Sequence, residues 1–248
     1  MVILIFLFGL FIGSFLNVCI SRIPSGESIA YPPSHCSHCN SSLKSLDLVP
    51  IFSYVLLKGR CRYCKSKISL EYPFMELITG FLFALLYLKF GLSFNLIKYI
   101  IFTSLAIVIG IIDFKTQDVY VSITIAGFVF GAILTLIEKI LYNHSVMDNL
   151  LGALIPAAVI SLIVFTTKGM GEGDIEIAAL CGLFLGLKLS VLMILLSFVL
   201  GGVVGGLLII FKIKDKKDYM AFGPYIVIAT FLSIMWGNDI ILWYFLLF

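Results

Sequence analysis

Runs of about 20 apolar residues, the length that a helix needs to cross the hydrocarbon layer, recur along the whole chain and limit its fold more than any other feature. Hydrophobic residues make up 61% of the 248 residues, charged residues only 12%, and the mean hydropathy is +1.13. A soluble domain of this size has too little interior to bury so much apolar surface. The sequence therefore predicts an all-α integral membrane protein.

Eight apolar runs are candidate transmembrane helices, near residues 2–20, 74–90, 96–112, 119–137, 150–166, 175–187, 189–211 and 222–247. The sixth is short, and its boundary with the seventh falls around Lys188. Gly237–Asn238–Asp239 is a candidate break in the last run. The first run lacks a basic segment before it and a cleavage site after it, so we interpret it as a retained helix. We expect a first helix (1–20), a polar insertion (21–73) and a polytopic domain (74–248).

The basic residues fall mostly on one side of this predicted bundle. If the amino terminus faces outward and the spans alternate, only four of the 17 lie on the outer side: Lys89, Lys98, Lys139 and Lys188. The inner loops then hold Arg22, Lys44, Lys58, Arg60, Arg62, Lys65, Lys67, Lys115, Lys168, Lys212, Lys214, Lys216 and Lys217. Because inner loops carry the positive excess, we expect a multi-pass protein of the plasma membrane with a cytoplasmic insertion. The net charge of +3 is too small to indicate nucleic-acid binding.

Four cysteines of the insertion form two pairs, Cys36-x-x-Cys39 and Cys61-x-x-Cys64. Each pair can hold one metal ion from a tight turn, and two pairs complete the tetrahedral thiolate shell of a structural zinc site. Two disulfides or four free thiols are the alternatives, and a reducing cytoplasm argues against disulfides. We therefore predict a structural Zn²⁺ that staples an insertion too small and too polar to fold around its own core.

The remaining thiols and imidazoles are expected to be bystanders. His35 and His38 are alternative metal ligands, which four available thiolates make unnecessary. Cys19 and Cys181 stand alone in apolar runs and are expected to be core residues. A catalytic zinc is not expected, because four thiolates leave no open position for water.

Two aspartates mark the predicted membrane boundary. Asp113 ends the third run, and Asp174 opens the sixth behind a segment that contains Gly169, Gly171, Glu172 and Gly173. By the orientation count, both acids lie at the cytoplasmic edge. Ionisable residues in such places are costly and are therefore candidates for function. The structural alternative is that Asp113 marks a helix end and Asp174 caps a helix.

The two acids suit a shared site that activates water. Asp174 lies near a helix amino terminus, where the dipole favours the ionised form, whereas Asp113 lies near a carboxyl terminus. We hypothesise that Asp174 holds the charge that activates water and that Asp113 carries a proton shared by the pair. The glycines before Asp174 let the backbone turn tightly and approach another chain closely, such as a substrate peptide.

Five segments carry a resemblance that runs along nearly the full length of the chain. They are Gly13-Ser14-Phe15-Leu16-Asn17-Val18 with Arg22-Ile23-Pro24; the paired cysteine motifs, with Val49-Pro50 and Lys58-Gly59-Arg60 between them; Glu71-Tyr72-Pro73-Phe74-Met75-Glu76; Gly169-Met170-Gly171-Glu172-Gly173-Asp174; and Ala221-Phe222-Gly223-Pro224-Tyr225. In these segments the chain resembles the type IV prepilin peptidase family.

The resemblance implies that Asp113 and Asp174 are a catalytic pair. It also implies cleavage of a short basic leader, typically just after a glycine, from pilins, pseudopilins or competence pilin-like proteins. Many family members also methylate the new amino terminus with S-adenosylmethionine. That role is associated with the amino-terminal region, in which Asn17, Arg22 and Glu76 are candidate methyltransferase or substrate residues.

The chain departs from the family pattern at two places. Tyr120-Val121 stands where the family often has Pro-Asp, and Glu176 stands where a lysine commonly follows the second acid. Both catalytic carboxylates remain, so these departures concern substrate preference. Asp118 is interpreted as a flanking polar residue.

Three other functions compete with this interpretation. A membrane thiol–disulfide oxidoreductase using the Cys-x-x-Cys pairs needs those pairs on the oxidising side, against the charge count. A proton-coupled transporter predicts acids near the bilayer midplane, and it leaves the cysteines without a purpose. An intramembrane aspartyl protease of presenilin type shares the two acids but is not expected to carry this insertion.

Overall fold

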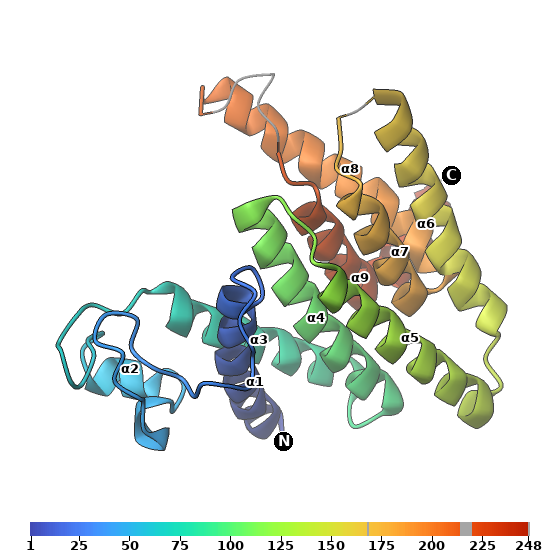
Figure 1. Ribbon diagram of the computed structural model, residues 1–248. Helices are drawn as coiled ribbons and strands as arrows, with labels where there is room; N and C mark the ends of the chain where they lie inside the picture. Colours follow the sequence, from blue (N-terminus) through green and yellow to red (C-terminus); the bar gives the residue numbers. More distant parts are fainter. Residues whose placement is uncertain (168, 214–219, 248) are drawn as a thin grey trace. The chain divides into compact units, whose positions relative to one another are not determined.

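The computed structural model describes residues 1–167, 169–213 and 220–247, and every long regular element in these ranges is a helix (Figure 1). No β-strand occurs in these ranges, and the only strand-like pairs are isolated bridges between His35 and Ser42 and between Arg60 and Lys67. The predicted all-α fold is therefore confirmed. Four lysines of the orientation count lie outside the described residues: Lys168, Lys214, Lys216 and Lys217.

Seven of the described helices are long and apolar enough to cross a membrane. They are α1 (Val2–Arg22), α3 (Glu71–Phe90), α4 (Phe94–Thr116), α5 (Val121–Tyr142), α6 (Val146–Thr167), α8 (Leu187–Ile210) and α9 (Gly223–Leu247). The count of about eight spans includes α7 (Gly173–Leu185), which has only 13 residues. At about 1.5 Å per residue, α7 is shorter than the hydrocarbon layer, and it differs in this from the seven long helices.

Two helix boundaries differ from the expected ones. The sixth and seventh runs separate at Gly186 rather than around Lys188, because Gly186 has a φ of +74°, which favours glycine. Asp148 accepts a hydrogen bond from the amide of Leu187 at 3.3 Å and caps the new helix. The candidate break in the last run is also wrong, since α9 continues through Gly237.

The chain forms two compact units, Met1–Ile100 and Ile101–Phe248. In the first unit, α1 packs along α3. Glycines permit this contact, since a Cβ built on Gly9 would lie 2.7 Å from Cα of Gly80, and one built on Gly13 would lie 2.8 Å from Cα of Glu76. The insertion adds the short helices η1 (Ser45–Asp47) and α2 (Phe52–Leu56).

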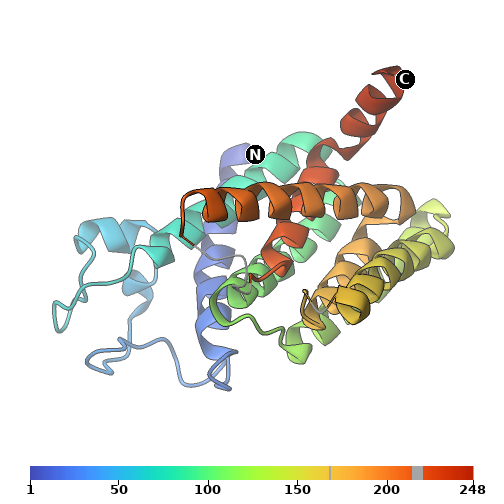
Figure 2. The ribbon, with the colours of Figure 1, turned by 90° about the horizontal axis from the view of Figure 1, so that it is seen from above.

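The second unit is organised around α7, which contacts α5, α6, α8 and α9. Helices α6 and α7 lie side by side in both views (Figure 1 and Figure 2). Ile177, Ala178 and Leu180 on α7 are at most 1% exposed. Neighbouring helices therefore enclose this short helix, and its amino-terminal end is a protein-lined position for a charged residue.

Candidate active site and metal centre

The four cysteines of the insertion converge on one point. The sulfur atoms of Cys36, Cys39, Cys61 and Cys64 all lie within 4.8 Å of one another, and this group can hold a metal ion. The Sγ atoms of Cys36 and Cys64 are 3.9 Å apart. A regular tetrahedron with Zn–S bonds of about 2.3 Å has S–S separations of about 3.8 Å, so the cluster has the dimensions of a zinc site. Neither histidine of the insertion belongs to this group.

The two Cys-x-x-Cys turns are built alike. The amide of Asn40 donates to the carbonyl of Cys36 at 2.8 Å, and the amide of Lys65 donates to the carbonyl of Cys61 at 3.0 Å. Asn40 and Lys65 both have positive φ angles, 54° and 61°. The same turn is thus formed twice, and each copy presents its two thiols toward the other.

The first turn also favours the thiolate form of its leading cysteine. Hydrogen bonds from the backbone amides of His38 and Cys39 lower the pKa of the Cys36 thiol to about 6. Thiolate rather than thiol is the form that binds metal. The chemistry of the donors and their spacing therefore both suit a structural zinc ion.

Replacing Cys36 by serine is expected to remove the metal. Purified wild-type protein should carry about one zinc ion per chain, as a Cys₄ site holds, and the Cys36→Ser protein almost none, as measured by elemental mass spectrometry. The insertion should then become sensitive to trypsin, because the metal closes a loop that lacks a core of its own. Cys19→Ala is the control, since Cys19 is buried in α1 and should not change the metal content. A metal-free wild-type protein with an ordered insertion would contradict this expectation.

Asn17, Arg22 and Glu76 are buried in the first unit, where the insertion joins the membrane helices. Nδ2 of Asn17 donates to the carbonyl of Tyr72 at 3.1 Å, and Nη1 of Arg22 donates to the carbonyl of Ser28 at 2.9 Å. Oε2 of Glu76 accepts a hydrogen bond from the amide of Ile51 at 2.7 Å, directly before α2. Each of the three side chains therefore holds a backbone group of the insertion.

Asp113 and Asp174 come together in the second unit. Asp113 lies one turn before the end of α4 and Asp174 is the second residue of α7; they are 4% and 3% exposed, respectively. Their charges are close enough to interact. Oδ2 of Asp174 accepts a hydrogen bond from the amide of Gly171 at 3.1 Å. Within the described residues, Oδ2 of Asp113 is buried and makes no hydrogen bond.

Gly223, the first residue of α9, is a third member of this site that the sequence analysis did not assign. Its backbone amide interacts with both carboxyl groups. A Cβ built on Gly223 would collide with Oδ2 of Asp113 and would lie 2.6 Å from Cδ1 of Ile177. The only signal in the sequence was the Phe222-Gly223-Pro224 element. Its distance along the chain from Asp113 and Asp174 does not indicate that Gly223 lies beside them in the fold.

The glycine segment before Asp174 is explained in part by packing within the chain. A Cβ built on Gly173 would lie 2.7 Å from Cβ of Val119, in the loop that follows Asp113. Gly173 therefore lets the two acid-bearing segments touch. Gly171 supplies the amide that binds Asp174, whereas Gly169 lies in the exposed part of the loop.

The acids around the pair differ in their surroundings. Glu172 is exposed at the amino-terminal cap of α7, and Asp118 is exposed beyond the end of α4. Oε2 of Glu176 instead accepts a hydrogen bond from Oγ1 of Thr124 on α5 at 2.9 Å. Glu176 thus ties α7 to α5, and Glu172 is the freer charge.

Comparison with known proteins covers both units. Residues 7–90 match the bacterial peptidase A24 N-terminal domain, and residues 100–206 match the type IV leader peptidase family. The chain is 33% identical to a prepilin leader peptidase/N-methyltransferase of Bacillus subtilis (strain 168), over 97% of this chain and 96% of that protein. Proteins with the same description from Aeromonas hydrophila and Pseudomonas putida are each 29% identical, over 97% and 94% of this chain and 92% and 89% of their own lengths. No solved structure matches the chain. The chain therefore belongs to the type IV leader peptidase family and is a multi-pass membrane peptidase.

Proposed function

We propose that the chain removes the short basic leader from prepilin-like precursors at the cytoplasmic face of the plasma membrane, with Asp113 and Asp174 as its catalytic pair. The observation that carries this proposal is the meeting of two buried carboxyl groups, from different helices, beside the amide of Gly223. The names of the relatives support the substrate class. The excess of basic residues in the inner loops supports the orientation.

The two carboxyl groups would divide the work on one water molecule. In this proposal the pair shares one proton, because two neighbouring carboxylates repel each other when both are ionised. Asp174 accepts the Gly171 amide at a helix amino terminus, which favours its ionised form, so it would take a proton from water. The resulting hydroxide would attack the carbonyl carbon of the scissile peptide bond. Asp113 would give its proton to the carbonyl oxygen, and the pair would then return a proton to the leaving amine.

The direct test is cleavage by the full-length protein reconstituted in lipid with a prepilin-like precursor, followed by mass spectrometry of the products. The expected product begins just after the leader, at a single position. A precursor that stays intact in the presence of folded, membrane-inserted protein would refute the proposal. The same spectra report the mass increase of one methyl group when S-adenosylmethionine is supplied.

Methylation of the new amino terminus is a second activity that we assign to the first unit. The relatives' names include an N-methyltransferase, and these matches span both units. The zinc-stapled insertion and the buried side chains of Asn17, Arg22 and Glu76 would shape a binding region for S-adenosylmethionine. A product that is cleaved but never methylated would leave the peptidase proposal standing and would remove this second one.

The exposed charge of Glu172 is expected to attract the basic leader. Glu172→Lys should raise the KM for the precursor about fivefold at low salt, the size expected for a charge interaction near water, and high salt should remove most of this difference. Glu172 suits this test better than Glu176, because Glu176 also holds Thr124.

The control for this test is Asp239→Lys, which makes the same change in net charge. Asp239 lies 16 residues after Gly223 on α9, or about 24 Å along the helix, and is exposed. An equal rise in KM for both variants, or none for Glu172→Lys, would contradict local attraction.

The arrangement of the four cysteines supports a metal site better than it supports a thiol–disulfide oxidoreductase. Four thiols converge on one point, whereas two redox pairs require only closeness within each pair. An oxidoreductase would lose activity in cysteine variants and keep it in Asp113 and Asp174 variants, so the cleavage assay separates the two functions.

A further inference from the structure

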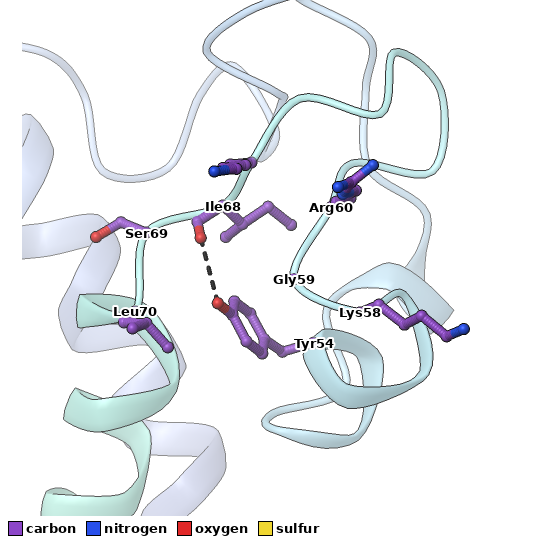
Figure 3. A pocket seen from close by; sticks show the side chains of 8 residues that line it. Tyr54, Lys58, Gly59, Arg60, Ile68, Ser69 and Leu70 are labelled. Carbon is purple, nitrogen blue, oxygen red and sulfur yellow. Dashed lines mark hydrogen bonds between the residues drawn. The ribbon is translucent and has the colours of Figure 1, made fainter.

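A pocket of about 590 Å³ opens in the insertion, between α2 and the segment that leads into α3 (Figure 3). Tyr54 of α2 forms one wall, and Ile68 and Leu70 lie across from it. This pocket belongs to the first unit and is built entirely from residues 54–70.

The backbone fixes the shape of the pocket. The hydroxyl of Tyr54 donates to the carbonyl of Ile68 at 3.3 Å, and the amide of Ile68 donates to the carbonyl of Gly59 at 2.8 Å. Gly59 has a φ of +65°, and a Cβ there would lie 2.8 Å from the Tyr54 hydroxyl. Hydrogen bonds within the insertion therefore define the pocket.

The lining carries three cations and no acid: Lys58, Arg60 and Lys67. In the part of the chain that the structure describes, the salt bridge of the insertion joins Arg62 to Asp47, and none of the three lining cations takes part in one. Arg60 and Lys67 face each other in the β-bridge that closes the second cysteine turn. This charge suits a phosphate group and would repel a basic leader.

Apolar side chains surround the same place. Phe52, Val55 and Leu56 are 59%, 66% and 80% exposed, and their spacing puts them on one face of α2. Leu70, at the rim of the pocket, is 73% exposed and directly precedes the membrane-spanning helix α3. The residue before a span lies at the level of the lipid headgroups. Exposed apolar side chains beside cations at that level are typical of a segment that lies in the membrane interface.

We propose that this pocket binds the phosphate-bearing headgroup of an anionic phospholipid, while the apolar face of α2 and Leu70 lie in the bilayer surface. A lipid headgroup and free phosphate both present a phosphate group to the three cations. The adjoining apolar side chains favour the lipid, because they can contact its acyl chains. The insertion is then held to the membrane at a site of its own, apart from the two helices that flank it. This inference does not depend on the peptidase activity.

Hydrogen–deuterium exchange of the full-length protein in nanodiscs tests the proposal. Amides of residues 52–70 should exchange more slowly in discs that contain phosphatidylglycerol than in discs of phosphatidylcholine alone. Phosphatidylcholine discs supplied with inorganic phosphate form the third arm. Equal exchange with both lipids would overturn the proposal, and full protection by inorganic phosphate would overturn the lipid as the source.

Charge variants locate the effect. The protection by phosphatidylglycerol should fall about fivefold for each lining cation removed, so Arg60→Gln/Lys67→Gln should lose most of it. Lys44→Gln/Lys65→Gln removes two exposed charges of the same insertion outside the pocket and should keep the protection. Equal losses in the two double variants would overturn a specific pocket.

The metal content of each variant shows whether the cysteine turns remain folded. If Arg60→Gln/Lys67→Gln loses its metal, the protection by phosphatidylglycerol is measured on Lys58→Gln instead, because Lys58 lies outside both cysteine turns. A loss of about fivefold in this variant supports the proposal. Unchanged protection overturns it.

Discussion

Replacing Asp113 or Asp174 by asparagine is expected to lower the rate of leader removal by about 10²-fold to 10⁴-fold. Asparagine keeps the size of the side chain, and the side-chain oxygen of the Asp174→Asn variant can still accept the Gly171 amide, so the fold should survive. The Asp174→Asn variant lacks the negative charge that takes a proton from water, and the Asp113→Asn variant lacks the proton that is given to the substrate. The rate is measured on reconstituted protein by mass spectrometry of the cleaved precursor.

A double variant separates a joint site from two independent contributions. Groups that act as a unit lose nearly everything with the first substitution, so Asp113→Asn/Asp174→Asn should be no slower than the slower single variant. Asp239→Asn serves as the control, because it removes an exposed carboxylate of the same unit far along α9. Complete leader removal by either single variant would mean that the pair is not the catalytic centre.

Gly223→Ala is expected to lower kcat about 100-fold without unfolding the protein. The added methyl group would meet Oδ2 of Asp113 and Cδ1 of Ile177, and Ile177 is fully buried, so the clash has to move the carboxyl group or the start of α9. A displacement of about 1 Å among reacting groups costs about that factor. Because we propose that the leader is attracted by exposed charge such as that of Glu172, KM should change little.

Gly202→Ala is the matched control for this variant. Gly202 also lies in a helix of the second unit, α8, but a Cβ there meets nothing within 4 Å. Its activity and its thermal stability should equal those of the wild type. If Gly223→Ala cleaved at the wild-type rate, the close approach of α9 to Asp113 would have no part in catalysis.

The membrane helices were predictable because their requirement is local. In a bilayer the backbone of a spanning helix satisfies its own hydrogen bonds, and the cost of placing polar side chains in hydrocarbon makes the sequence of such a helix a long apolar run. The runs near 2–20 and 96–112 accordingly became α1 and α4. Local chemistry also sufficed for the metal cluster, since each Cys-x-x-Cys turn is complete within a few residues.

The surroundings of α7 could not be predicted, because hydropathy is equally local. The hydropathy of a 13-residue apolar run is the same whether lipid or protein surrounds the run. Only the contacts of α7 with α5, α6, α8 and α9 show that neighbouring helices enclose it. Its end at Gly186 depends on a backbone angle, and the side chain that caps the next helix comes from Asp148 on α6. Neither the backbone angle of Gly186 nor the contact with Asp148 can be recognised from the apolar run itself.

By itself the sequence determined that this is a helical membrane protein, that four cysteines can share one metal, and that two aspartates lie near helix ends. The tertiary structure alone decided that Asp113 and Asp174 meet, that Gly223 lies beside Asp113 and a buried isoleucine, and that Glu176 is held by Thr124 while Glu172 is exposed. The physical reason is that hydropathy and turn chemistry act over neighbouring residues. The site instead forms from helix ends far apart along the chain, which are brought together only when α4, α7 and α9 pack.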